Sequence, residues 1–198
     1  MRVDLKRIGM ERGWIYEGIV STYSPEGQAH AAPMGFRSDD LKTIVVRPYK
    51  DTQSYINIRA KGCFVLNFVD DVGEFYTHIF EPEKAGMERF RRTDIDAPAL
   101  SCAPAYWQCK VLAFKEDGSG RGTVTAEIID GVGRPVLLSR APALALECII
   151  AATKLGVDAE KDAFLKQFLE ETAALIARVA PGSRYEEIAR ACLAHAKG

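Results

Sequence analysis

Short runs of β-branched and aromatic residues, broken by turn signals, dominate the first part of the chain. They predict strands at 14–22, 29–36, 41–46 and 63–69, and two more at 106–115 and 123–129 on either side of a glycine-rich turn. The run Thr43-Ile44-Val45-Val46 is typical of a buried strand. These strands at short spacing, with one crossover helix near 51–60, predict a closed or partly closed barrel. The fold class is therefore mainly β with helices (α+β).

Two stretches of the barrel part do not follow the strand pattern. Residues 72–92 have a helical spacing of apolar positions, and residues 94–104 contain two prolines and indicate an irregular linker.

The pattern changes after residue 135. From there the chain is rich in alanine and leucine, and apolar positions at helical spacing predict helices at 142–155, 158–179 and 185–197. We expect residues 1–135 to form the barrel and residues 136–198 to form a helical extension packed on the barrel or on a dimer. The apolar faces of these helices are interpreted as core packing or as a dimer surface.

Composition narrows the function classes. The 198 residues are 47% hydrophobic with a net charge of −1, so the chain can bury a sizeable core and lacks the basic excess of a nucleic-acid surface. No apolar run is long enough to span a bilayer, and we expect a cytoplasmic protein that does not engage a membrane. The three histidines and five cysteines have no metal-ligand spacing, so no metal is expected. The sequence also has no Gly-x-Ser-x-Gly motif, which marks the nucleophile of many hydrolases, and no Walker or Rossmann glycine pattern for nucleotides.

One segment places two cations directly before a predicted helix. Pro48 follows the strand that ends at Val46 and has no N–H for a ladder, so the chain leaves the sheet there. The helix is predicted to begin near Asp51 or Thr52, because cap-type residues precede apolar positions at helical spacing.

Such a helix start can hold a phosphate. Its first N–H groups have no partner within the helix, and hydroxyls and cations gather beside them: Arg47, Lys50, Thr52 and Ser54. The alternative is an ordinary capped helix on a solvated loop, with Asp51 as an internal anion that repels phosphate. The residue types alone leave both interpretations open.

A second unusual stretch is His30-Ala31-Ala32-Pro33-Met34-Gly35-Phe36. Small residues, a proline and a glycine within a strand indicate a bulged or bent edge that something planar can approach closely. A barrel corner without any ligand gives the same pattern.

Together these stretches resemble a known family. The segments Ala31-Ala32-Pro33-Met34-Gly35, Lys50-Asp51-Thr52 with Asn57-Ile58, and Phe64-Val65-Leu66-Asn67 are similar to the FMN-binding split barrel of the flavin reductase and pyridoxamine-phosphate-oxidase-like superfamily. Within that superfamily, the opening Tyr16-Glu17-Gly18-Ile19-Val20-Ser21-Thr22 resembles the domain-of-unknown-function 447 (DUF447) family.

The resemblance implies a homodimer that binds one FMN per barrel at the subunit interface. Carried over by position, it assigns the phosphate to Arg47, Lys50, Thr52 and Ser54, and the ring to the backbone of Ala32, Pro33, Met34 and Gly35. Further contact candidates are Tyr49, Gln53 and Asn67. His30 and His78 can protonate a substrate, but each is more often a surface or packed histidine.

Three functions stay open at this point. The first is an FMN-dependent oxidoreductase, flavin reductase-like, acting on a small molecule. The second is a non-catalytic FMN carrier or sensor, whose helical extension contacts a partner. The third is a structural dimer that has lost its cofactor, against which Lys50, Thr52 and Gly35 argue. No catalytic residue is identified.

Overall fold

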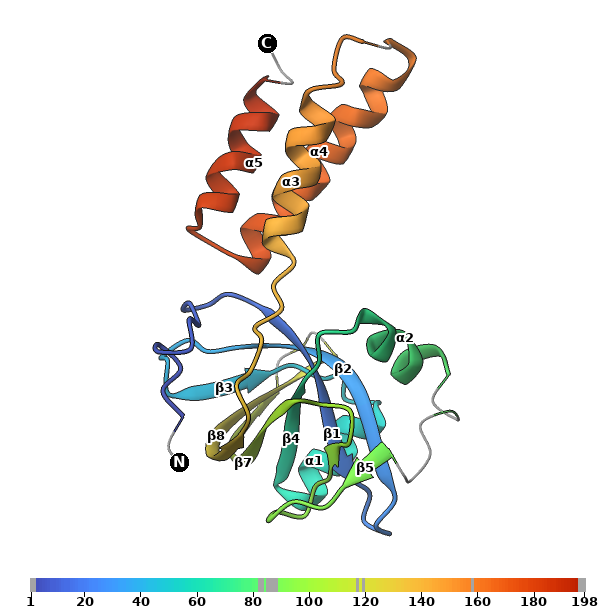
Figure 1. The fold of residues 1–198 in the computed structure, drawn as a ribbon, viewed down its shortest axis with the longest axis vertical. Coiled ribbons are helices and arrows are strands. Elements are labelled where there is room, and N and C mark those ends of the chain that lie inside the picture. The colour runs from blue at the N-terminus through green and yellow to red at the C-terminus, as the bar shows by residue number, and fades with distance from the viewer. Residues whose placement is uncertain are drawn as a thin grey trace. The chain divides into compact units, whose positions relative to one another are not determined.

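The structure, a computed structural model, describes residues 3–81, 84, 89–116, 118, 120–157 and 159–195. Its contacts divide the chain into two compact units: Met1–Arg12 with Glu17–Leu138, and Gly13–Tyr16 with Ser139–Gly198. Figure 1 shows the strands of the first unit and the long helices of the second.

The first unit is built on a closed barrel with the strand order β1-β2-β3-β8-β7-β4. These strands are β1 (Tyr16–Tyr23), β2 (Ala29–Arg37), β3 (Thr43–Val46), β4 (Cys63–Phe68), β7 (Ala105–Glu116) and β8 (Gly122–Val132). The pairs β1–β4, β2–β3, β3–β8, β4–β7 and β7–β8 are antiparallel. The predicted α+β fold class with a split-barrel core is confirmed.

Three aromatic rings fill the barrel. Phe36, Phe68 and Trp107 are almost completely buried, and their ring centroids lie 4.5 to 6.3 Å apart in edge-to-face arrangements. Aromatic pairs of this kind stabilise a core beyond the area that they bury.

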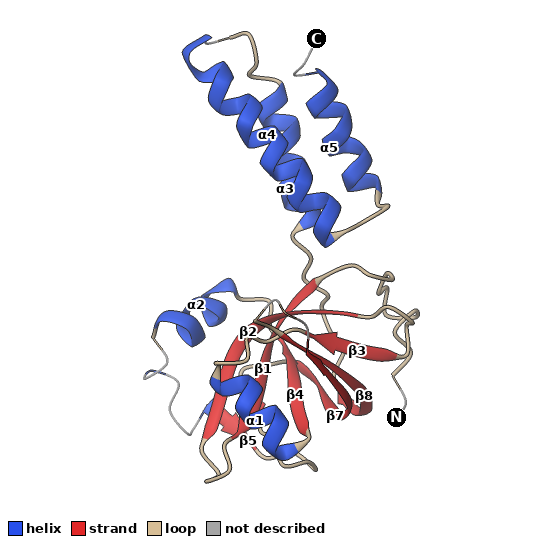
Figure 2. Ribbon diagram, turned by 180° about the vertical axis from the view of Figure 1, so that it is seen from behind, coloured by secondary structure: helices blue, strands red, loops and turns tan. Residues whose placement is uncertain are grey.

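Two helices contact β2. α1 (Gln53–Lys61) packs against β2 and β4, and α2 (Val72–Phe80) packs against β2. Figure 2 shows both helices on the outside of the barrel.

The predicted helix over 72–92 is wrong beyond its first part. α2 ends at Phe80, and Phe90–Arg91 forms β5, which pairs with β6 (Ala99–Leu100) inside the predicted linker. Pairing across the sheet and burial of Leu100 override the helical spacing that the sequence shows. Residues 82, 83 and 85–88 of the predicted helix lie outside the described residues.

The second unit contains the three predicted helices of the C-terminal part: α3 (Ala141–Ala152), α4 (Ala159–Val179) and α5 (Arg184–His195). Its buried core includes Cys148, Leu169, Ile176 and Ala189.

The strand predicted over 14–22 begins later than expected, at Tyr16. Trp14 and Ile15 pack against the helical core instead, because Ile15 N–H donates to the Val179 carbonyl at 2.7 Å. The Trp14 ring meets Tyr185 edge-on at 6.0 Å.

Candidate functional site

The connection from β3 to α1 is fixed by the β7–β8 hairpin. Lys50 N–H donates to the Gly120 carbonyl at 3.1 Å, and Gly122 N–H donates to the Pro48 carbonyl at 3.0 Å. Pro48 cannot donate, but its carbonyl still accepts, so pairing with the hairpin continues beyond the end of β3. The hairpin thus sets the position at which α1 begins.

The start of α1 has no side-chain cap. The helix begins at Gln53 after Thr52, whose hydroxyl donates to the Tyr49 carbonyl at 2.6 Å and accepts no hydrogen bond from the N–H groups of the first turn. The first turn contains no acidic residue, and Ser54 in that turn is buried. Its N–H groups have no acceptor within the helix, and the positive end of the helix dipole is not neutralised from within the turn.

A glycine on β8 allows α1 to lie against the hairpin. A Cβ on Gly122 would collide with the ring of Tyr55, which is buried and also meets Phe114 edge-on at 6.2 Å. The close approach of Tyr55 therefore requires glycine at this point of β8.

The carboxylate of Glu116, at the end of β7, accepts three hydrogen bonds from side chains. The donors are Lys50 Nζ, Tyr55 Oη and Arg59 Nη1, each at 2.9 Å. The hydrogen bond from Lys50 is the main reason why the pKa of Glu116 lies below its ordinary value, and the bond from Tyr55 follows. Lys50, a predicted phosphate ligand, thus has a carboxylate partner in this structure.

Arg121 on the same hairpin adds a cation that the sequence analysis did not identify. Its guanidinium carbon lies 3.9 Å from the ring centroid of Tyr49, and it donates to the Tyr49 hydroxyl and, at 3.4 Å, to the Arg47 carbonyl. Tyr49 and Arg121 also form an isolated antiparallel bridge. Only the pairing of β3 with β8 brings these positions together, and no local sequence signal reports that pairing.

The small-residue stretch lies in β2, which runs unbroken from Ala29 to Arg37. Its pairing with β3 covers Phe36 and Arg37, so within the described strands the ladder to β3 stops where the small-residue stretch begins. The predicted ring-contact residues are all partly exposed: Ala32, Pro33, Met34 and Gly35. Ala31 is buried instead, in a cluster that Phe75 of α2 joins.

His30 joins the two predicted stretches. Its Nε2 lies 3.1 Å from Ser54 Oγ, so β2 meets the first turn of α1 directly. Burial lowers the pKa of His30, and the charge of His78 on α2 lowers it further. The neutral imidazole is therefore favoured in this structure.

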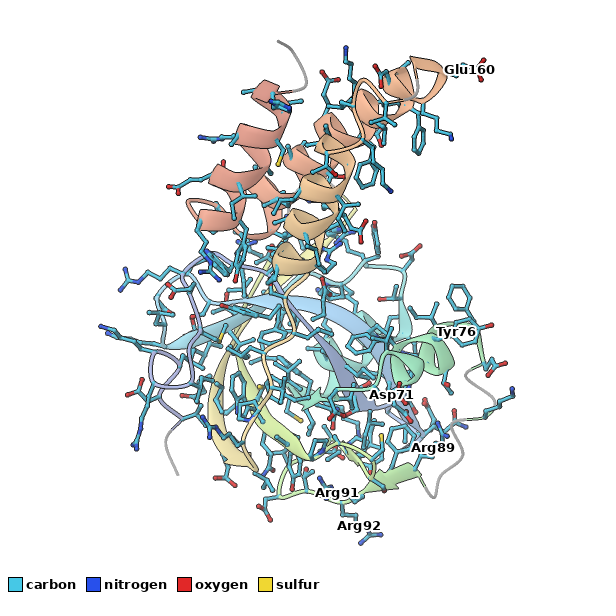
Figure 3. All side chains as sticks on the ribbon, turned by 45° about the horizontal axis from the view of Figure 1, so that its top comes forward. Asp71, Tyr76, Arg89, Arg91, Arg92 and Glu160 are labelled. Atoms are coloured by element: carbon cyan, nitrogen blue, oxygen red, sulfur yellow. The ribbon has the colours of Figure 1, made fainter. Side chains whose placement is uncertain are left out.

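His78 belongs to a polar cluster on α2. Its Nδ1 donates to the Glu74 carbonyl at 2.8 Å, and Glu74 Oε2 lies 3.6 Å from Arg89 Nη1. Figure 3 shows Arg89 on the same side of the barrel as Asp71 and Tyr76. His78 Nε2, Glu74 Oε2 and Arg89 Nη1 are buried without a hydrogen-bond partner among the described residues.

Two of the predicted contact residues have other partners. The Asn67 amide is fully buried, donates to the Ile19 carbonyl and Ser21 Oγ, and accepts from Leu100 N–H at 2.8 Å. These contacts give Asn67 a structural role between β1, β4 and β6, and they occupy both ends of its amide.

Gln53 is engaged within α1 itself. Its amide donates to Asn57 Oδ1 at 2.7 Å, while Asn57 Nδ2 donates to Thr22 Oγ1 at 3.0 Å. Gln53 is exposed at the helix start, so its position stays compatible with a ligand contact.

Among the described residues, no group of histidine, cysteine and carboxylate side chains is arranged to hold a metal ion. Likewise, none of the described helices combines the length and apolar character that a membrane span requires.

Solved structures with a similar fold include several flavin proteins. An FMN-bound DUF447 protein of Methanosarcina mazei has a TM-score of 0.55 and 18% identity, covering 97% of this chain and 100% of its own. A flavin reductase, HpaC, solved with NADP+, has a TM-score of 0.53 and 20% identity, covering 66% of this chain and 85% of its own. The 2-nitrobenzoate 2-nitroreductase of Pseudomonas fluorescens has a TM-score of 0.50 and 27% identity, covering 66% and 70%.

The comparison with protein families is more specific than these fold similarities. The model described as "Protein of unknown function (DUF447) N-terminal domain" matches residues 16–132, which span the whole barrel from β1 to β8. The chain therefore belongs to the DUF447 family.

Proposed function

We propose that this protein binds FMN, with the phosphate at the start of α1 and the ring along β2. The observation that carries the proposal is the meeting of His30 and Ser54, which brings the small-residue stretch of β2 to the first turn of α1. A flavin mononucleotide has a planar ring and a phosphate joined by a short chain, and it needs these two kinds of surface close together.

The residues at the helix start fit a phosphate. Thr52 leaves the first turn without a side-chain cap, and the buried hydroxyl of Ser54 lies in that turn. Lys50 and Arg47 supply positive charge from the preceding loop, and Lys50 can exchange its partly exposed contact with Glu116 for a phosphate. Tyr49 and Gln53 are exposed beside them and are assigned as secondary contacts.

The proposed site on β2 suits a flat ring. Ala32 and Gly35 have little or no side chain, so the backbone is accessible where the ladder to β3 has stopped. Met34 and Pro33 add apolar surface.

We further propose that the protein acts as a flavin-dependent oxidoreductase of the flavin reductase type. When bound, FMN supplies the hydride and electron transfer in its own ring, and this chain's residues only hold and orient it. The flavin reductase solved with NADP+ supports a reduced nicotinamide as the first donor to test.

A homodimer is part of the proposal. Large apolar side chains are exposed on α2, including Val72 at 68% and Phe80 at 66%, and on β7 and β8, including Leu112 and Ile129. Exposed apolar surface of this kind favours an interface between subunits. Sedimentation should give a dimer, and a strict monomer would contradict this part of the proposal.

The second candidate is an FMN carrier or sensor without turnover. Exposed apolar side chains on the helical unit favour it, among them Leu146, Val157 and Phe164, because they offer a surface for a partner protein.

Stopped-flow reduction of the FMN-loaded protein separates the two functions. Reduced nicotinamides and a reduced deazaflavin are mixed with it, and bleaching of the flavin absorbance is followed. Reduction at about 1 s⁻¹ or faster at saturating donor supports an oxidoreductase. Reduction no faster than that of free FMN supports the carrier.

A further inference from the structure

His30 occupies a position from which it can reach an anion at the start of α1. Its Nε2 lies 3.1 Å from Ser54 Oγ, and Ser54 is the second residue of α1. The N–H groups of this first turn point to the same end of the helix. A group that accepts hydrogen bonds from Ser54 and from these N–H groups therefore lies within reach of the imidazole.

The contact with Ser54 accommodates either charge state of His30. A hydroxyl can donate to a neutral ring nitrogen or accept from a protonated one. A phosphate, in contrast, only accepts and carries negative charge, so it interacts more strongly with the imidazolium.

The surroundings of His30 disfavour its protonated form, because burial and His78 both lower the pKa of His30. From α1 its hydrogen-bonding partner is the neutral Ser54. From α2 the facing group is His78, whose charge lowers the pKa of His30 after the larger effect of burial. Glu74 Oε2 lies 3.8 Å from His78 Nδ1 and 3.6 Å from Arg89 Nη1, so a carboxylate and a second cation accompany His78. On the β3–α1 loop, Lys50 is paired with Glu116 and Asp51 is exposed.

We propose that His30 is a fifth phosphate ligand, which binds the FMN phosphate beside Ser54 and takes up a proton from solvent as it does so. This inference rests on the proposed function. In addition, the affinity for FMN then depends on pH through the protonation of His30 on β2. The proton bound by His30 favours FMN at low pH, and this advantage is lost as the pH rises through the pKa that His30 has in the complex.

The test compares FMN with riboflavin, which lacks the phosphate. Binding is measured by flavin fluorescence between about pH 5.5 and about pH 8.5 for the full chain and for His30→Gln, because glutamine can bond Ser54 but cannot be protonated. The second ionisation of the phosphate of free FMN, with a pKa of about 6, is the same for both proteins and cancels in the ratio of their affinities.

We expect the intact protein to prefer FMN over riboflavin at least about fivefold more strongly than His30→Gln does near pH 6, with the two converging near pH 8.5. Parallel pH curves for the two proteins would overturn the inference. If the intact protein shows no preference for FMN at any pH, the proposed function itself fails.

A measurement without any variant of His30 covers the case in which His30→Gln does not fold. Calorimetric titration in two buffers of different ionisation heat, near pH 7.5 where the phosphate is mostly dianionic, counts the protons taken up. FMN should bind with net proton uptake and riboflavin with none. His78→Gln is the matched control: it removes a group whose Coulombic effect lowers the pKa of His30, so the pH-dependent preference for FMN should extend to higher pH. The absence of net proton uptake in both proteins would contradict the role of His30.

Discussion

Lys50 Nζ lies 2.9 Å from Glu116 Oε2, so a cation of the proposed phosphate site has an internal carboxylate partner. The pair joins the loop before α1 to the end of β7, and both side chains are partly exposed. A phosphate at the helix start and the carboxylate of Glu116 would compete for the same ammonium group.

Glu116→Gln should therefore tighten FMN binding by roughly two- to fivefold and leave riboflavin unchanged, since exposed ion pairs contribute little and only FMN has the phosphate. Glu127→Gln on β8 removes the same charge away from Lys50 and should leave both affinities unchanged. Weaker FMN binding by Glu116→Gln would mean that Glu116 positions Lys50 instead of competing for it.

Replacing Lys50 and Thr52 together by alanine should weaken FMN by about 10- to 100-fold, because a charge-assisted hydrogen bond to the phosphate is lost. Riboflavin should change far less. Lys42→Ala, at an exposed lysine in the turn before β3, serves as the control. Equal losses for the two flavins would refute the assignment of the phosphate.

Gly35→Val should exclude flavin while the barrel still folds, because a branched side chain on β2 would occupy the space proposed for the ring. Flavin titration and circular dichroism measure the two effects on the same sample. Undiminished affinity would place the ring elsewhere.

Gly122→Ala should destabilise the protein by about 1–3 kcal/mol, since its Cβ collides with the ring of Tyr55. The same change should cost much less in a Tyr55→Ala background, where the ring is gone. Denaturant unfolding of the two single variants and the double variant measures this coupling, and strictly additive effects would contradict the contact.

Asn67→Leu should cost about 2–5 kcal/mol in the free energy of unfolding, because the Ile19 carbonyl, Ser21 Oγ and the Leu100 N–H each lose a buried hydrogen bond to the Asn67 amide. The ratio of FMN to riboflavin affinity should stay unchanged in the folded fraction. A changed ratio would indicate that Asn67 contacts the bound FMN.

Local patterns predict the fold where local chemistry decides it. Neighbouring residues are enough to predict strand β3 from its β-branched run, the end of that strand at the proline, and the helix that follows. β5 cannot, because Phe90 and Arg91 become a strand only by pairing with Leu100 and Ala99.

The candidate site divides in the same way. Lys50, Thr52 and Ser54 are recognisable from their place before and within a helix start. Glu116 reaches Lys50, and Arg121 reaches Tyr49 and the Arg47 carbonyl, only because β3 pairs with β8, a neighbour that is distant in sequence. The contact between His30 and Ser54 likewise depends on how α1 packs on β2, which no local signal reports.

Equilibrium titration of the purified, flavin-free protein with FMN and with riboflavin, followed by flavin fluorescence and absorbance, tests the central claim most directly. We predict that FMN binds at least about tenfold more tightly than riboflavin, with a shifted flavin spectrum, as phosphate recognition at the start of α1 requires. No measurable binding of FMN, or equal affinity for the two flavins, would contradict it.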